Sequence, residues 1–209
     1  MEVVVTGASG LIGQALVAIL EARGDRVRRM VRRPIADPSE IRWDPDRGHL
    51  NPAALVGIEA VIHLAGAGIA DRRWTRPQMN RILESRTRGT QLLARSLAEA
   101  RPLGGPEVLV SGSAIGFYGD RGEEALTETS PRGTGFLADV CVAWEDATRD
   151  ADRAGLRVAH ARTGVVLARS DGLLARLLPL FRVGLGGRIG SGRQFMSWIS
   201  LTDEVMALA

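Results

Sequence analysis

The chain has 209 residues, of which 45% are hydrophobic and 24% charged, and this balance excludes a disordered chain and suits one folded α/β domain. Its 27 basic residues are all arginine, they are dispersed among 24 acidic ones, and only 4% of the chain is aromatic, so no basic face with stacking aromatic rings is predicted for nucleic acid. The lack of a long apolar run, the first strand pattern at residue 2 and the single Cys141 exclude a membrane span, a signal peptide and an internal disulfide, and they predict a cytoplasmic protein.

Short apolar runs alternate with helical patterns along the chain. Continuous apolar runs predict buried strands, and apolar residues at helical spacing predict amphipathic helices. The expected strands cover residues 2–5, 26–31, 39–43, 60–66, 107–111 and 157–162. The expected helices run from Leu11 towards Gly24, from about 77 to 100 and from 136 to 153. This alternation predicts a Rossmann-type α/β fold, with a doubly wound parallel sheet covered by helices on both faces.

A glycine-rich segment, residues 6–13, joins the first expected strand to the first expected helix. Its sequence Thr-Gly-Ala-Ser-Gly-Leu-Ile-Gly has small residues where the chain turns sharply, where the backbone approaches an anion and where helix and strand pack closely. The start of the helix adds free N–H groups and the positive end of the helix dipole. Such a string also fits a tight turn that binds nothing, but the strand that follows at 26–31 completes a βαβ unit. The segment therefore predicts a site for the pyrophosphate of a dinucleotide.

The end of the second expected strand distinguishes between the two nicotinamide dinucleotides. Sites for NAD usually carry an acid about 20 residues after the glycines, where it accepts hydrogen bonds from the ribose hydroxyls. This chain has Val31-Arg32-Arg33-Pro34 there. Because a guanidinium makes paired hydrogen bonds to phosphate, we predict NADP as the cofactor, with Arg32 as the residue that binds its 2′-phosphate. The alternative is that both arginines are solvated residues at the end of a strand.

The last residues predict an incomplete element. Residues 202–204, Thr-Asp-Glu, have the pattern of a helix amino cap followed by acids, and the sequence stops at Ala209 before that helix is long enough to form by itself. We therefore expect residues 1–209 to be one NAD(P)-binding domain from a longer protein.

Several further segments resemble a known superfamily. Together with the glycine loop, residues 63–66, 86–90, 111–113 and 117–120 are similar to the extended short-chain dehydrogenases/reductases. Residues 72–74, 84–86, 136–145, 162–167, 185–187, 190–194 and 198–199 resemble more closely its subfamily of NAD(P)-dependent epimerases, also labelled SulA-like nucleoside-diphosphate-sugar epimerases.

The resemblance implies an oxidoreductase or epimerase that acts on a small molecule, a sugar nucleotide or a carbonyl compound, with NADP lying across the strand ends. It further implies that residues 1–209 are truncated before a small carboxy-terminal domain. It also implies a set of cofactor contacts: Gly7, Ser9, Gly10, Leu11 and Ile12 at the pyrophosphate, Val31 and Arg32 at the adenosine phosphate, Leu64, Ala65 and Gly66 below the cofactor, and Arg86 and Val165 further along. Each contact also has a structural alternative. Leu64, Ala65 and Val165 would then be ordinary core residues, and Arg86 would pair with an acid such as Glu84 or be solvated.

The usual catalytic pair of the superfamily is missing from this sequence. Its members typically use a Tyr as acid/base and a Lys four residues later, because a fixed cation lowers the pKa of the phenol. This chain has no lysine, and the corresponding helical positions fall near Leu137 and Cys141. The remaining candidates for proton transfer are Ser113, Tyr118 and Asp139, each of which has a structural role as an alternative. A non-catalytic NADP-binding sensor or regulatory module is the other function that fits.

The histidines give no sign of a metal site. His49, His63 and His160 are far apart in sequence and have neither an acid at helical spacing nor partnering cysteines, so no metal ligands are predicted. We expect His63, in a strand that ends at the cofactor, to be a hydrogen-bonded core residue.

Overall fold

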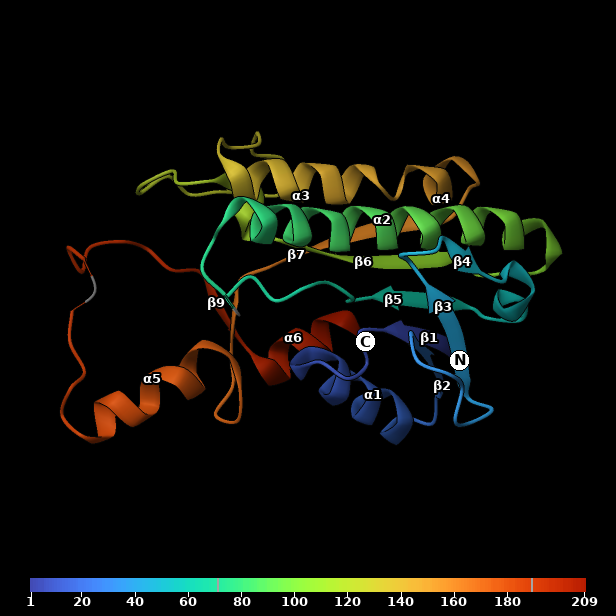
Figure 1. The fold of residues 1–209 in the computed structure, drawn as a ribbon, viewed down its shortest axis with the longest axis horizontal. Coiled ribbons are helices and arrows are strands. Elements are labelled where there is room, and N and C mark those ends of the chain that lie inside the picture. Colours follow the sequence, from blue (N-terminus) through green and yellow to red (C-terminus); the bar gives the residue numbers. More distant parts are fainter. Residues whose placement is uncertain (71, 189) are drawn as a thin grey trace.

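A seven-stranded sheet forms the centre of the molecule (Figure 1). The computed structural model describes residues 1–70, 72–188 and 190–209. The strand order is β4-β3-β2-β1-β5-β6-β7, and all neighbours are parallel except β3 and β4. The strands are β1 (Glu2–Thr6), β2 (Arg26–Val31), β3 (Glu40–Asp44), β4 (His49–Leu50), β5 (Ala60–His63), β6 (Val108–Ala114) and β7 (Arg157–Thr163). This arrangement confirms the predicted doubly wound sheet.

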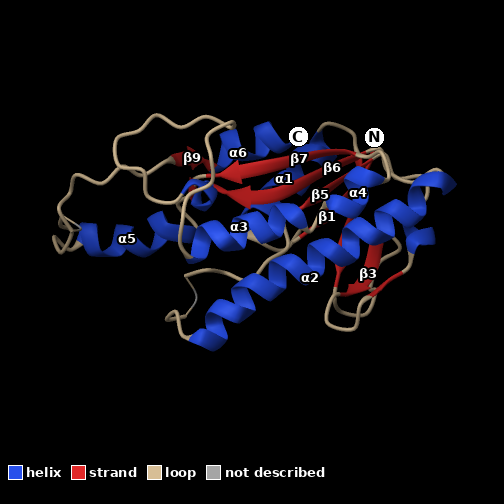
Figure 2. Ribbon diagram, turned by 90° about the horizontal axis from the view of Figure 1, so that it is seen from above, coloured by secondary structure: helices blue, strands red, loops and turns tan. Residues whose placement is uncertain are grey.

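Helices cover both faces of this sheet, as Figures 1 and 2 show. One face carries α2 (Arg76–Ala100), α3 (Phe136–Asp146) and α4 (Arg149–Arg153), and the other carries α1 (Leu11–Ala22) and α6 (Leu201–Leu208). Short 3-10 turns occur at η1 (Pro52–Leu55), η2 (Arg101–Leu103) and η3 (Ile115–Tyr118). Although α2 has 25 residues, neither it nor any other helix within the described residues is long and apolar enough to cross a membrane.

The alternation of side chains along β1 divides the core in two. Val4 packs into the core on the α2 side, whereas Val3 and Val5 pack into the core on the α1 side. The α2-side core also contains Ile41, Trp43, Leu93, Leu97 and Leu109, and the α1-side core contains Leu16, Leu20, Ile62 and Val205. Both faces of β1 are therefore buried, as expected for a central parallel strand.

The strand order reverses beside β1. From β1 the chain moves to β2 and β3 on one side, and then returns to pair β5 with the other side of β1. In open α/β sheets, ligands bind at the carboxyl ends of the strands where the order reverses, because the connections there diverge and leave a crevice. The carboxyl ends of β1, β2 and β5 are thus the expected position for a ligand.

The single helix predicted over residues 136–153 is two helices, and that prediction was wrong. α3 ends at Asp146 and α4 begins at Arg149. The Thr148 hydroxyl donates to the Glu145 carbonyl at 2.7 Å, and its backbone N–H bonds to the same oxygen at 3.1 Å. A side chain that competes for backbone carbonyls interrupts a helix at this point.

The last residues form a short helix, with its cap two residues before the predicted position. Ser200, not Thr202, caps α6, because its hydroxyl accepts the N–H of Asp203 at 3.0 Å. Val205 and Leu208 are buried in the core beside α1, and Arg23 donates to the Ala209 carbonyl at 2.7 Å. Burial of one apolar face stabilises an eight-residue helix that would be unstable alone.

Three further elements have no counterpart in the sequence predictions. β8 (Val165–Leu167) and β9 (Trp198–Ser200) form a small parallel sheet, and α5 (Gly172–Arg182) lies between them in sequence. The predicted strand over residues 60–66 is shorter than expected, since β5 ends at His63. Figure 1 shows α5 beside the main body, away from the central sheet.

Candidate functional site

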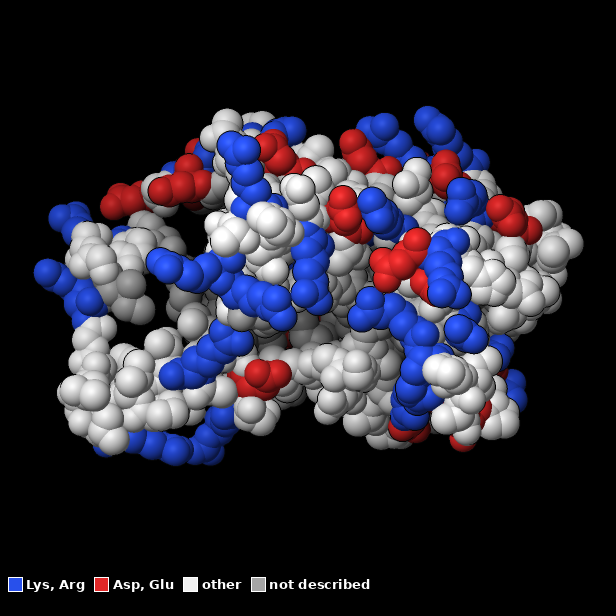
Figure 3. Space-filling view, viewed as in Figure 1, with Lys and Arg blue, Asp and Glu red and all other residues white. Residues whose placement is uncertain are grey.

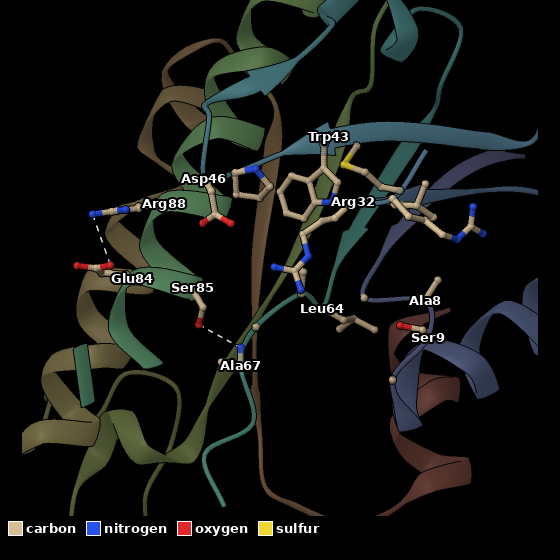
Figure 4. A pocket seen from close by; sticks show the side chains of 18 of the residues that line it. Ala8, Ser9, Arg32, Trp43, Asp46, Leu64, Ala67, Glu84, Ser85 and Arg88 are labelled. Carbon is tan, nitrogen blue, oxygen red and sulfur yellow. Dashed lines mark hydrogen bonds and ion pairs between the residues drawn. The ribbon is translucent and has the colours of Figure 1, made fainter. Parts of the chain in front are cut away.

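A cleft of about 820 Å³ lies at the carboxyl ends of β1, β2 and β5 and is closed on one side by α2 (Figure 4). Among the described residues, four segments and one helix face line this cleft. They contribute residues 7–10, residues 29–33 with Glu40, residues Trp43, Pro45 and Asp46, residues 64–67, and the α2 residues Pro77, Asn80, Arg81, Glu84, Ser85 and Arg88.

The three glycines of the loop differ in what surrounds them. Gly7 has a φ of +69°, and a Cβ atom there would lie 2.8 Å from the Leu64 backbone. A Cβ on Gly13 would lie 2.2 Å from the Gly7 carbonyl oxygen, so this glycine allows α1 to pack against the loop after β1. A Cβ on Gly10 would meet only that same oxygen, at 3.4 Å. Gly10 therefore leaves open space at the mouth of α1, on the wall of the cleft.

The amino end of α1 offers hydrogen-bond donors to this space. Gly10 is its N-cap, no side chain caps the helix, and no acidic residue lies in its first turn. The first N–H groups of a helix have no partner within the helix and carry the positive end of its dipole. An anion at Gly10 would satisfy them, as a pyrophosphate does in dinucleotide folds.

A buried hydrogen-bond chain fixes the loop after β5. The Thr6 hydroxyl accepts the N–H groups of Leu64 and Ala65 at 3.1 and 3.2 Å and lies 2.7 Å from Nδ1 of His63. Because the hydroxyl accepts twice, its proton goes to Nδ1, so Nε2 carries the ring proton and donates to Thr90 at 2.9 Å. Burial lowers the pKa of His63 to about 4, which keeps the ring neutral. His63 is thus the hydrogen-bonded core residue that was predicted.

The two arginines after β2 differ in their partners. Figure 4 shows the Arg32 side chain extending into the cleft between Trp43 and Leu64. Arg33 instead forms a bidentate ion pair with Glu40, whose second oxygen lies 2.9 Å from the guanidinium. The neighbouring Arg29 pairs with Glu21 at 2.7 Å. Among the described residues Arg32 has no hydrogen bond or ion pair, so of these three arginines it is the one available to a ligand.

The wall formed by α2 was not predicted from the sequence. The residues that face the cleft recur at helical spacing, from Pro77 through Arg81 to Arg88, and this spacing is the signal that could have identified them. Ser85 accepts the N–H of Ala67 at 3.0 Å and so connects α2 to the loop after β5. On the face shown in Figure 3, arginine side chains over α2 and α4 alternate with acidic ones.

Eight of the twelve predicted cofactor contacts line the cleft, namely Gly7, Ser9, Gly10, Val31, Arg32, Leu64, Ala65 and Gly66. Four lie outside its lining. Leu11 and Ile12 form the first turn of α1, with the Leu11 side chain near Gly172, and Val165 belongs to β8, where its N–H donates to Ser197. Arg86 lies over the Trp144 ring at 4.9 Å and donates to the Ala67 carbonyl at 2.9 Å, so it does not pair with Glu84.

A second group of polar side chains lies at the carboxyl end of β6. The Ser113 hydroxyl donates to Glu145 at 2.6 Å, and Arg162 holds both oxygens of that carboxylate, at 2.8 and 2.9 Å. Arg162 also donates to the Tyr118 hydroxyl at 2.9 Å. Burial acts to raise the pKa of Glu145, but the hydrogen bonds from Arg162 and Ser113 outweigh it and the pKa is lowered. The network therefore contains a carboxylate paired with a guanidinium.

The structure brings Ser113 and Tyr118 together through Glu145 and Arg162, but it does not bring Asp139 to them. Asp139 is 65% exposed on α3 and pairs with Arg132. The positions expected for the usual catalytic pair, Leu137 and Cys141, face the turn at Gly116, where an added Cβ would lie 3.3 Å from Leu137 and 3.6 Å from the Cys141 sulfur. Burial raises the pKa of the Cys141 thiol.

A parallel sheet whose order reverses at β1, an open glycine at the mouth of α1 and an arginine at the end of β2 define a dinucleotide-binding protein of the Rossmann class. A family model named "NAD dependent epimerase/dehydratase family" matches residues 3–208. The chain belongs to this family, which confirms the resemblance to extended short-chain dehydrogenases/reductases inferred from its motifs.

Known proteins with similar sequences or folds agree with this assignment. An epimerase family protein of Mycobacterium bovis is 48% identical over 206 residues, which are 99% of this chain and 67% of the relative. The crystal structure of a nucleoside-diphosphate sugar epimerase from Corynebacterium glutamicum matches with a TM-score of 0.87 and 39% identity, over 100% of this chain and 42% of that one. The crystal structure of human epimerase family protein SDR39U1 (isoform 2) with NADPH matches with a TM-score of 0.88 and 35% identity, over 100% and 68%.

The relatives are longer than the chain described here. It spans about two thirds of the Mycobacterium protein and less than half of the Corynebacterium chain. A small carboxy-terminal domain after residues 1–209 stays a prediction.

Proposed function

We propose that this protein binds NADP(H) in the cleft at the ends of β1, β2 and β5 and uses it in oxidoreductase or epimerase-like chemistry on a small molecule. The observation that carries the cofactor is the Arg32 guanidinium, which extends into the cleft while Arg29 and Arg33 are both paired with acids. A planar guanidinium without a partner suits a 2′-phosphate and has no counterpart to bind on an unphosphorylated ribose. The human neighbour solved with NADPH supports this choice.

The proposed pose follows the lining of the cleft. The pyrophosphate lies at Gly7, Ser9 and Gly10 and accepts the free N–H groups at the start of α1, which Leu11 and Ile12 supply with their backbones. The remaining contacts come from Val31 and Arg32 at the phosphorylated ribose and from residues 64–66 below the cofactor. Contacts from Arg86 and Val165 stay predictions.

Replacing Arg32 is expected to reduce the preference for NADPH. Arg32→Ala removes a charge-assisted contact to the 2′-phosphate, so we expect the Kd for NADPH to rise by about tenfold or more while the Kd for NADH stays the same. Isothermal titration calorimetry with both cofactors measures the two constants.

Arg42→Ala is the matched control, because Arg42 is exposed on the neighbouring strand β3 and lies outside the lining of the cleft. It should leave both constants unchanged. Equal affinity of the wild-type protein for NADPH and NADH would contradict the proposed cofactor preference.

We further propose that Ser113 and Tyr118 are the polar groups closest to the reaction. In the register of the parallel sheet, His63 at the end of β5 lies beside Ser111 of β6. Ser113 is two residues further along β6, so it lies level with the loop after β5, whose residues 64–67 line the cleft. Because Ser113 donates its proton to Glu145, its oxygen is oriented to accept a hydrogen bond from a substrate hydroxyl. We infer that these groups act in place of the Tyr–Lys pair, and the paired, exposed Asp139 is the weakest of the three candidates.

The substrate class that we propose is a sugar nucleotide or a carbonyl compound, in line with the sugar epimerase among the structural neighbours. Purified protein with NADPH should consume the cofactor with at least one member of a panel of such compounds. Ser113→Ala should lower kcat by about a hundredfold, the usual contribution of a positioned proton-transfer group, without changing the Kd for NADPH. If the wild-type protein binds NADPH but turns over no member of the panel, the alternative of a sensor or regulatory module is favoured.

A further inference from the structure

The cleft contains a buried acid on the side where a 2′-phosphate would bind. Among the described residues three carboxylates line the cleft, and two of them, Asp46 and Glu84, are exposed to solvent. The third, Glu40 at the start of β3, is only 7% exposed. Water screens an exposed charge, but it cannot screen a buried one in the same way. An unpaired Glu40 would therefore repel an anion in this cleft.

Arg33 neutralises this carboxylate. Its guanidinium donates hydrogen bonds to both carboxylate oxygens of Glu40, and one of these oxygens also accepts the N–H of Ala36 at 2.9 Å. The hydrogen bond from Arg33, together with that from Ala36, lowers the pKa of Glu40, so the acid is charged at neutral pH and needs its partner. The pair is thus a cation and an anion that cancel each other beside Arg32.

The position of Glu40 makes this cancellation relevant to the choice of cofactor. A carboxylate near the end of the second strand is the feature that NAD sites use to accept the ribose hydroxyls, and it disfavours a phosphorylated ribose. Here the acid comes from the next strand, where Glu40 lies beside Arg29 in the register of β2 and β3. Paired with Arg33, it can neither accept a ribose hydroxyl nor repel a phosphate.

We propose that Arg33 is a positioning residue for cofactor choice, which permits NADP by masking Glu40, while Arg32 makes the direct contact to the 2′-phosphate. This inference rests on the proposed NADP site. It assigns different roles to two adjacent arginines, of which the sequence indicated a role for Arg32 alone.

A double-mutant cycle separates this role from the alternatives. Kd values for NADPH and NADH are measured by calorimetry for the wild type, Arg33→Ala, Glu40→Gln and the double variant. Arg33→Ala exposes the charge of Glu40, so NADPH should bind about tenfold more weakly, and NADH should bind no more weakly than to the wild type. Glu40→Gln keeps an acceptor for the Ala36 N–H and should retain NADPH binding. In the double variant NADPH affinity should return to within about twofold of the wild type, the usual error of additivity.

Three results would overturn the proposal. Weakening of both cofactors by Arg33→Ala would mean that the ion pair only holds the loop in place. Weak NADPH binding that persists in the double variant would mean that Arg33 touches the phosphate directly. An unchanged Kd for NADPH in Arg33→Ala would mean that the charge of Glu40 does not act on the bound cofactor. If Arg33→Ala fails to fold, Arg33→Gln, which keeps a hydrogen bond but loses the charge, is expected to show the same selective loss.

The wild type provides the test of the underlying function. Equal affinity of the unmodified protein for NADPH and NADH would overturn both the proposed cofactor and this inference. A wild-type preference for NADPH that Arg33→Ala leaves intact would overturn the inference alone.

Discussion

Gly10→Val is expected to abolish dinucleotide binding while leaving the fold intact. The valine side chain would project from the N-cap of α1 into the space where the pyrophosphate is proposed to lie, and it would separate the phosphate oxygens from the free N–H groups of the helix. Losing two hydrogen bonds to a charged group weakens binding by about a hundredfold or more. Calorimetry with NADPH measures this loss, and thermal denaturation shows whether the protein is still folded.

The structure indicates why this variant should fold. A Cβ on Gly10 would meet only the Gly7 carbonyl oxygen, at 3.4 Å, and the φ of Gly10 is −80°, which any residue adopts. Gly13→Ala is the contrasting variant, because its Cβ would lie 2.2 Å from that same oxygen. We expect it to lose about 3 kcal/mol of stability through overpacking between α1 and the glycine loop. NADPH affinity in Gly10→Val equal to that of the wild type would contradict the proposed site at the mouth of α1.

The features that were predicted correctly from the sequence are those that depend on neighbouring residues. The run Arg26 to Val31 is a strand in the structure with the predicted bounds, and the glycine loop lies between β1 and α1 as expected. Small residues in a loop and apolar residues at regular spacing act over a few positions, so their pattern is visible in one sequence. The same holds for Arg32, whose place at the end of β2 followed from its distance to the glycines.

The features that were missed depend on contacts between distant segments. Glu40 pairs with Arg33 across a loop, and Thr6 meets His63 because β1 and β5 are neighbours in the sheet. α6 forms because Val205 is buried beside α1. No local pattern shows which charged residues will be paired. The prediction of Arg32 therefore rested on its position after β2, and the ion pair that occupies Arg33 was not predicted.

Breaking the Arg162–Glu145 ion pair at the end of β6 is expected to destabilise the protein strongly. Arg162 and Glu145 have side chains that are 20% and 12% exposed, and Glu145 also accepts the Ser113 proton. Arg162→Ala leaves a partly buried carboxylate without its cation, and breaking a buried pair in this way costs about 3–5 kcal/mol. Urea denaturation measures the loss in the free energy of unfolding. Arg149→Ala is the matched control, since its pair with Asp146 has side chains 62% and 50% exposed and should contribute less than about 1 kcal/mol.

The stability difference between the wild type and Arg162→Ala should also depend on pH. In the wild type the pKa of Glu145 is lowered, so its pair contributes stability above the ordinary glutamate pKa and loses it as the pH falls through the lowered value. In Arg162→Ala burial still acts to raise the pKa of the Glu145 carboxyl, while the Ser113 hydrogen bond and the charge of His160 act to lower it. We expect burial, the largest of these effects, to raise the pKa, so that protonation at low pH relieves the buried charge. The difference in stability between the two proteins should therefore shrink as the pH is lowered from 7 to about 4. Glu145→Gln in the Arg162→Ala background removes the same charge at every pH and should recover part of the loss at pH 7. A difference that does not change with pH, or a double variant no more stable than Arg162→Ala, would mean that packing of Arg162 against Phe117, and not the unpaired charge of Glu145, causes the loss.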